Sequence, residues 1–227
     1  MKSVNLTDVV PPEVRSAALW TFANESIGHL LTDEDREQIK REIAAAFEIV
    51  FASMRIDTDN DHNTKETATR IARMYVDEVF RGRFHPMPRM TEFPNAKRLD
   101  ELYTVGPVTV RSACSHHFVP IIGKAWLGVI PSERLIGLSK FTRLTEWVMA
   151  RPQIQEEAAV QLADAIEDCI QPHGLAVVIK AQHLCMTWRG VRDNGTEMVT
   201  SVMRGAFRDN PMAREEFMAI IKGQGYA

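Results

Sequence analysis

The chain has 227 residues, of which 45% are hydrophobic and 25% charged, enough for one main buried core. Its formal net charge is −3, so no overall basic field indicates a nucleic acid or an anionic membrane surface as a partner. The N-terminus lacks the apolar core of a signal peptide, and no run approaches the ~20 apolar residues that cross a bilayer. We therefore expect a soluble, cytoplasmic protein. The three cysteines, an odd number, argue against a disulfide framework and favour metal binding or catalysis.

The first part of the chain predicts an arm and then a helical hairpin. Residues 1–31 contain two adjacent prolines and only a short apolar stretch, so we expect an N-terminal arm. From Thr32, a candidate N-cap, apolar residues recur at helical spacing as far as Met54. A second helix is predicted by the apolar stripe Ile71, Met74, Tyr75 and Val79. The two helices predict an antiparallel hairpin, which with the loop after it covers residues 32–95.

Residues 96–227 predict a catalytic domain. Segments 103–114 and 123–131 have strand character, and Ser139 is expected to cap a helix. A further helix is predicted to begin at Pro152 and to stop at Gly174, followed by strands over 175–185 and 199–207 and a last helix at Pro211. This order, strand-strand-helix-helix-strand-strand, predicts an α+β fold with an antiparallel sheet and helices on one of its faces.

Two short motifs gather the residues that bind metals. The first is Cys114-Ser115-His116-His117 and the second is His183-Leu184-Cys185. On an extended strand His183 and Cys185 face the same side, whereas Cys114 and His117 share a target only if the chain turns after Ala113. Thiolate and imidazole suit Zn²⁺, and a catalytic zinc keeps three protein ligands and a water. Five candidates exceed that need, so two histidines could serve as general acid and base.

Other interpretations of these motifs are weaker. A lone Cys or His is most often a buried core residue, but clustering in two places argues against that interpretation here. A zinc finger is disfavoured, because CxxH and HxC lack the CxxC or HxxxH pairing of fingers. A Cys-His hydrolase with Cys114 as nucleophile stays open, although it leaves Cys185 without a role.

Cations and carboxylates in two further segments are suited to a nucleotide. The segment GLSKFTRL places Ser139, Lys140 and Arg143 at a helix start, where backbone N–H groups, the helix dipole and paired cations can bind phosphate. Arg189 and Arg192 follow the second metal motif. In RPQIQEE, a carboxylate could accept two hydrogen bonds from the N1–H and 2-amino edge of guanine, which distinguishes guanine from adenine. The candidate residues there are Gln155, Glu156 and Glu157.

Taken together, the motifs resemble the GTP cyclohydrolase I family over roughly residues 33 to 222, in order and spacing. They are TRIARMYVDEVF, CSHHF, IGLSKFTRL, RPQIQE, HLCMTWRGVRD and TSVMRGAFR. The resemblance implies a tunnelling fold, in which antiparallel sheets from several subunits close into an oligomeric barrel. It further implies a homodecamer of two stacked five-fold rings with active sites at subunit interfaces.

The resemblance also implies a reaction and the residues that perform it. The cofactor would be Zn²⁺ and the substrate GTP, hydrolysed at C8 to formate and 7,8-dihydroneopterin triphosphate, which feeds folate, pterin or 7-deazaguanine synthesis. The implied zinc ligands are Cys114, His117 and Cys185. The implied catalytic residues are the acid-base pair His116 and His183, with Ser139 as a proton donor near the sugar. The implied substrate contacts are Gln155 and Glu156 on guanine, Ser139, Lys140, Arg143 and Arg189 around ribose and triphosphate, and Arg70 from a neighbouring subunit.

Three positions depart from the family pattern. Ser115 stands where Glu is usual, Ala68 where Pro is usual, and Arg204 where a small or apolar residue is common. None of them removes an implied ligand or substrate contact. Two alternatives remain: a tunnelling-fold paralogue acting on another purine or pterin, and a structural zinc protein without catalysis. The second would have no need of His116, His183 or the phosphate-binding cations.

Overall fold

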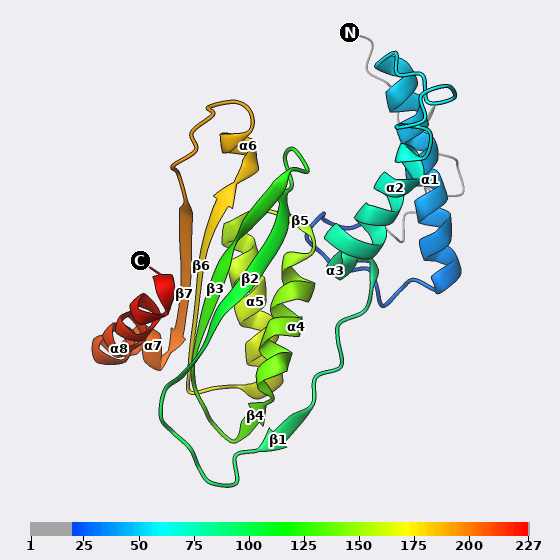
Figure 1. The fold of residues 1–227 in the computed structure, drawn as a ribbon. Coiled ribbons are helices and arrows are strands. Elements are labelled where there is room, and N and C mark those ends of the chain that lie inside the picture. The colour runs from blue at the N-terminus through cyan, green and yellow to red at the C-terminus, as the bar shows by residue number, and fades with distance from the viewer. Residues whose placement is uncertain (1–19, 227) are drawn as a thin grey trace.

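The computed structural model describes residues 20–226, so most of the expected N-terminal arm lies outside the described residues. Its helical hairpin consists of α1 (Asp33–Ser53) and α2 (Thr67–Arg73), which continues into η4 (Met74–Val79) and α3 (Arg81–Phe84). Figure 1 shows α1 and α2 side by side and antiparallel, away from the sheet. The predicted hairpin is confirmed. Among the described residues, no helix is both long and apolar enough to cross a membrane.

The start of α1 follows from its sequence. The Thr32 hydroxyl accepts a hydrogen bond from the Asp35 backbone N–H at 3.2 Å, and the Asp35 carboxylate accepts one from the Thr32 N–H at 2.8 Å. This reciprocal pair is a capping box, which satisfies two backbone donors at the helix start. The expected N-cap at Thr32 is confirmed.

The stripe predicted for the second helix is confirmed only in part, since Ile71, Met74 and Tyr75 are half-buried. The buried side chains of this segment are Ala68, Ala72, Val76 and Phe80, whereas Val79 is 39% exposed. Two of the four are alanines, which a search for large apolar residues overlooks. In addition, the i→i+5 bonding of η4 rotates its side chains away from the positions of a regular α-helical stripe.

The central sheet has the strand order β5-β2-β3-β6-β7. The strands are β2 (Tyr103–Cys114), β3 (Pro120–Ile130), β5 (Pro152–Gln153), β6 (Gly174–His183) and β7 (Met198–Gly205). All neighbours pair antiparallel except β5, which runs parallel to β2, so the sheet is mixed rather than wholly antiparallel. A separate antiparallel pair is formed by β1 (Glu92–Pro94) and β4 (Arg134–Ile136). The α+β class and the order of the main elements are confirmed.

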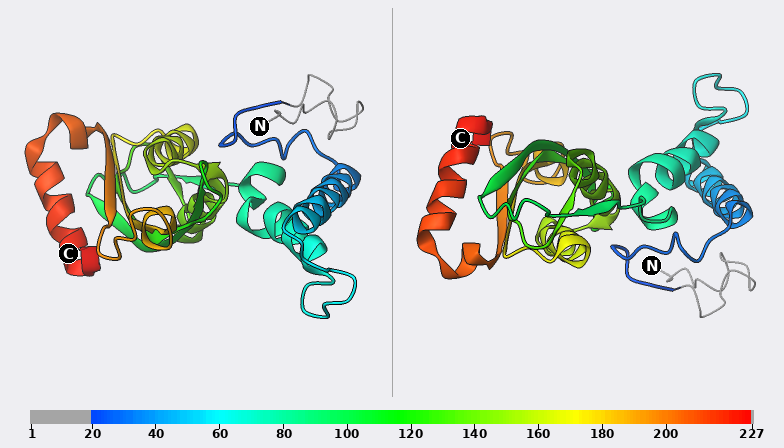
Figure 2. Two further views of the ribbon diagram at one scale, coloured as in Figure 1. Left: turned by 90° about the horizontal axis from the view of Figure 1, so that it is seen from above. Right: turned by 90° about the horizontal axis from the view of Figure 1, so that it is seen from below.

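Helices cover both faces of the sheet. On one face lie α4 (Leu138–Met149) and α5 (Gln155–Ile170), with a core that includes Leu127 and Val177. On the other lie α7 (Ala206–Asp209), α8 (Pro211–Ile221) and η5 (Lys222–Tyr226), with a core that includes Trp126 and Val178. Figure 2 shows the sheet between the two sets of helices. The expectation of helices on one face was wrong. Successive strand residues point to opposite faces of the sheet, and because both sets are apolar here, both faces are buried under helices.

Several element ends differ from those predicted. The N-cap of α4 is Gly137, and the Ser139 side chain makes no capping hydrogen bond. Pro152 lies in β5, where a proline without an N–H is tolerated at the sheet edge, and α5 begins three residues later. The C-cap of α5 is Gln171, with φ 45°, so Gly174 begins a strand and does not end the helix. The chain leaves β6 at His183 and forms one helical turn, α6 (Leu184–Thr187).

Candidate metal centre

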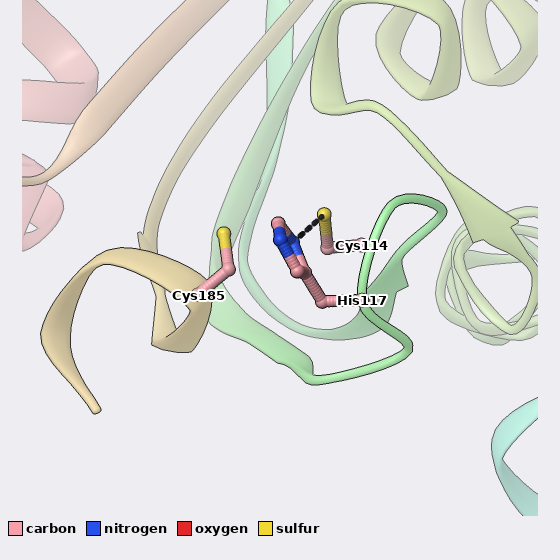
Figure 3. Close-up of side chains that lie close together, drawn as sticks. All are labelled: Cys114, His117 and Cys185. Atoms are coloured by element: carbon pink, nitrogen blue, oxygen red, sulfur yellow. Dashed lines mark hydrogen bonds between the residues drawn. The ribbon is translucent and has the colours of Figure 1, made fainter. Parts of the chain in front are cut away.

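Cys114, His117 and Cys185 converge at one end of the sheet. Cys114 is the last residue of β2, and the Phe118 N–H donates to its carbonyl at 2.8 Å, so the chain reverses directly after it. The expected turn after Ala113 is therefore confirmed. Cys185 approaches from α6, and one donor atom from each residue lies within 4.8 Å of the others. Figure 3 shows the three side chains directed toward a common point.

His183 and Cys185 do not share a side, as an extended strand would have required. Because β6 ends at His183, the turn of α6 carries the Cys185 sulfur toward Cys114. The His183 ring is directed instead at Gln155, with its Nε2 2.8 Å from the amide oxygen Oε1. The pairing of Ile121 with His183 holds this end of β6 beside the turn between β2 and β3.

The electrostatics of the three donors fit a divalent metal. Burial raises the pKa of the Cys185 thiol, and the nearby Cys114 sulfur raises it further, while Arg189 opposes the shift. A bound cation would instead lower the pKa of this thiol, because it favours the thiolate over the thiol. Two sulfurs and one imidazole form the whole donor group found among residues 20–226, and such ligands suit a divalent metal such as zinc.

Two further candidates from the sequence lie beside this centre. The Nδ1 atom of His116 is 3.7 Å from the Cys114 sulfur, and the ring is exposed. The Arg189 guanidinium lies 2.9 Å from Nε2 of His117, so the expected cationic group close to the metal residues is present. The structure thus places an imidazole and a guanidinium beside the three donors.

The Gln155 side chain is buried, with 3% of its surface exposed. Its amide nitrogen donates to the carbonyl oxygens of Ile179 and Met198 and to the Thr200 hydroxyl, each at 3.1 Å. Thr200 opens the motif TSVMRGAFR but is absent from the sequence-based candidates, because its contact with Gln155 joins residues 45 positions apart. The partner His183 is half-buried, and burial lowers its pKa while the Glu156 carboxylate opposes that shift.

Glu156 is exposed and lines a cavity of about 680 Å³, together with Ser115, Gln153 and Glu157. The residue before Glu156 in α5 is Gln155, whose amide oxygen lies 2.8 Å from Nε2 of His183. Ser115, which replaces the Glu usual in the resembling family, therefore lies on the wall of the same cavity.

The phosphate-binding candidates on α4 lie at the other end of the sheet. The ring of Phe141, next to Lys140 in the chain, is 6.3 Å from that of Tyr103, the first residue of β2. Since β2 has 12 residues, its two ends are about 35 Å apart. Ser139 and Lys140 are thus remote from Cys114 of the same chain. The Lys140 ammonium donates to the Arg89 carbonyl at 2.8 Å.

Arg143 and Arg70 also stand apart from the metal centre. Arg143 lines a second cavity, of about 1030 Å³, between the hairpin and β2. Arg70 is exposed on α2 and pairs with Glu66 at 3.0 Å. A single chain therefore assembles the metal residues with His116 and Arg189, whereas Ser139 and Lys140 lie at the far end of its sheet.

A three-donor metal centre flanked by histidines, on an α+β sheet, is the arrangement of a metal-dependent enzyme rather than of a structural zinc module. A family model described as GTP cyclohydrolase I matches residues 43–222. The chain belongs to the GTP cyclohydrolase I family, and the resemblance seen in its motifs is confirmed.

Individual relatives agree with the family match. GTP cyclohydrolase 1 of Pectobacterium carotovorum subsp. carotovorum (strain PC1) is 36% identical over 189 residues, 83% of this chain and 86% of the relative. GTP cyclohydrolase 1 of Haemophilus influenzae (strain PittEE) is 35% identical over 84% of this chain and 85% of the relative. The corresponding enzyme of Edwardsiella ictaluri (strain 93-146) is 38% identical over 82% and 85%. Among solved structures, an archaeosine synthase QueF-Like in the apo form matches 53% of this chain and 97% of its own, with a TM-score of 0.36 and 15% identity.

Proposed function

We propose that this chain hydrolyses GTP at C8 of the guanine, releasing formate and forming 7,8-dihydroneopterin triphosphate. The observation that carries the proposal is the convergence of Cys114, His117 and Cys185 beside His183 in a chain of this family. The relatives named GTP cyclohydrolase 1 support the same substrate. The product would supply a pterin, folate or 7-deazaguanine pathway.

The metal of this proposal is zinc, held by Cys114, His117 and Cys185. When bound, it supplies Lewis-acid activation of water at neutral pH. His183 protonates N7 of the guanine, which makes C8 electrophilic toward water. After ring opening to a formamide, a second hydration releases formate, and exposed His116 can exchange protons with solvent during these steps. Rearrangement of the ribose and ring closure complete the dihydropterin, with Ser139 as proton donor near the sugar.

Glu156 is the proposed guanine reader. Glu156 lines the cavity of about 680 Å³ and follows Gln155, whose amide oxygen lies 2.8 Å from Nε2 of His183. A carboxylate accepts from the N1–H and 2-amino groups of guanine, whereas adenine has no N1–H and no 2-amino group. Selection against ATP follows from this difference.

The triphosphate site requires a second subunit. Ser139 and Lys140 are too far from Cys114 of their own chain to contact the same nucleotide, and Arg70 lies on the hairpin of residues 32–95. Within the described residues, β7 pairs only with β6, and β2 pairs on its outer side with β5 over two residues only. Such open edges favour pairing between subunits into a closed barrel, as in a tunnelling fold. We include a homodecamer with interfacial sites in the proposal.

Zinc-loaded protein given GTP and, separately, ATP tests the proposed reaction. We expect formate release and a dihydropterin absorbance band with GTP and neither with ATP. Absence of both, at about one zinc per chain as a three-donor site requires, would reject this substrate and favour a paralogue acting on another purine or pterin. The same assay shows whether Ser115 and Ala68 are compatible with turnover.

A further inference from the structure

The amide of Gln155 is committed to the protein itself. It is the first residue of α5, and its side chain inserts between β6 and β7, where it contacts Ile179, Met198 and Thr200 through its nitrogen and His183 through its oxygen. Only two hydrogens are available on the amide nitrogen for the three acceptors within 3.1 Å. The group therefore has no donor left for a ligand.

The neighbours of Gln155 determine which way its amide points. Two of the three atoms near its nitrogen are backbone carbonyl oxygens, of Ile179 and Met198, which can only accept hydrogen bonds. Rotating the amide by half a turn would place its own oxygen against both carbonyls, which is repulsive. The amide oxygen must therefore face His183, and Nε2 of that histidine must carry the hydrogen that it donates.

With its Nε2–H bonded to Gln155, the ring can give a proton to a substrate only from Nδ1 of the imidazolium form, in which both nitrogens carry hydrogen. In a metal or acid-base site, the second nitrogen of a histidine is commonly fixed in this way by a buried acceptor. Consecutive residues of an α-helix project about 100° apart, so Gln155 can point into the sheet while Glu156 faces the cavity.

We propose that Gln155 is a positioning residue, which accepts a hydrogen bond from Nε2–H of His183 and so fixes the orientation of that ring, and that Gln155 does not itself read the base. The inference rests on the proposed function, because the ring that Gln155 holds is the one that transfers a proton in that reaction. Guanine recognition then depends on Glu156. Thr200 supports the amide from β7 and is the outer member of this chain of contacts.

The Gln155→Ala variant tests the assignment through separate readings of kcat and KM. We expect kcat for GTP to fall about 10- to 100-fold, as for other residues that orient a catalytic group, with KM changed less than about threefold. Zinc content should stay the same. The matched control is Thr145→Ala: Thr145 is also buried, but its hydroxyl donates to the Phe141 carbonyl within α4. It should lose stability while kcat is retained.

A double-mutant cycle separates positioning from base reading. If Gln155 acts through His183, adding Gln155→Ala to His183→Ala should lower kcat by less than about twofold further, because the group being positioned is gone. A base-reading residue would instead raise KM tenfold or more in both backgrounds, and that result would overturn the inference. Failure of the wild-type protein to turn over GTP would reject the proposed function, which is a distinct outcome.

Discussion

The two ends of the sheet differ in how much of a site one chain builds. At the end where β2 finishes, donors from Cys114, His117 and Cys185 come within 4.8 Å of one another. At the opposite end, Ser139 is exposed and the Lys140 ammonium bonds to a backbone carbonyl. Folding of a single chain thus organises the metal donors, whereas under the proposed function the cations on α4 would contact the same nucleotide only from a second chain.

Removing a metal donor should have the largest effect. Cys185→Ala is expected to lose zinc and to lower turnover about a thousandfold or more, because two donors hold a metal poorly and water is no longer activated. Metal analysis together with formate release checks both results. The control is Cys169→Ala, which changes a cysteine outside the donor group and should keep zinc and activity. Retained turnover in zinc-free Cys185→Ala protein would contradict a metal mechanism.

Removing His183, the proposed general acid beside the metal centre, should lower turnover nearly as much but leave metal binding intact. His183→Ala is expected to bind zinc normally and to lose turnover by about 10²- to 10⁴-fold, the usual contribution of a general acid. Zinc stoichiometry and single-turnover formate release distinguish the two properties. Loss of zinc in this variant would mean that His183 is a ligand, which would count against the three-donor centre.

Mixing inactive variants tests the division between the two ends directly. Cys185→Ala removes a metal donor at the end of the sheet where β2 finishes, which we call the metal end. Lys140→Ala weakens the phosphate-binding cations at the opposite end, the cation end, so neither variant alone should turn over GTP efficiently. If each site combines the two ends from different chains, random co-assembly should restore roughly a quarter of the sites, since each half is intact in about half of the subunits. The measurement is turnover after joint refolding or co-expression, compared with the separately prepared variants. No gain on mixing would indicate that one chain supplies both ends.

The smallest effect concerns stability at the cation end. Arg204 of β7 pairs with Asp164 and Glu167 of α5, and both carboxylates are more than one-third exposed. Arg204→Met is therefore expected to cost at most about 1 kcal/mol in the free energy of unfolding. Denaturant unfolding at low and high salt should show a difference from wild type that shrinks as salt screens the charges. Altered zinc binding in this variant would contradict the separation of the two ends.

Local signals in the sequence predicted much of the architecture. The capping box at Thr32 and Asp35 involves residues three apart, and the turn after Ala113 follows from the requirement that Cys114 and His117 share a target. The metal residues were predictable because cysteine and histidine are uncommon and gather in two short motifs. The family match agrees with the reaction that these motifs indicated.

What could not be predicted depends on distant partners. The single turn of α6 lies within an apolar run that resembles a continuing strand, so the sequence placed Cys185 on β6. The orientation of Gln155 is determined by Met198 and Thr200, more than 40 residues away. The helices on the second face of the sheet are held by Phe207 and Phe217, which share a buried cluster with Trp126. No local sequence pattern reveals this packing.

The short loop after Cys114 has a practical consequence for preparing this protein. Because all three metal donors belong to one polypeptide, dissociated subunits can be fully loaded with metal. Metal stoichiometry is then a measure of correct folding of the chain but gives no information on quaternary integrity. A sample can pass an elemental assay and still be inactive, so sedimentation or light scattering has to accompany every specific-activity value.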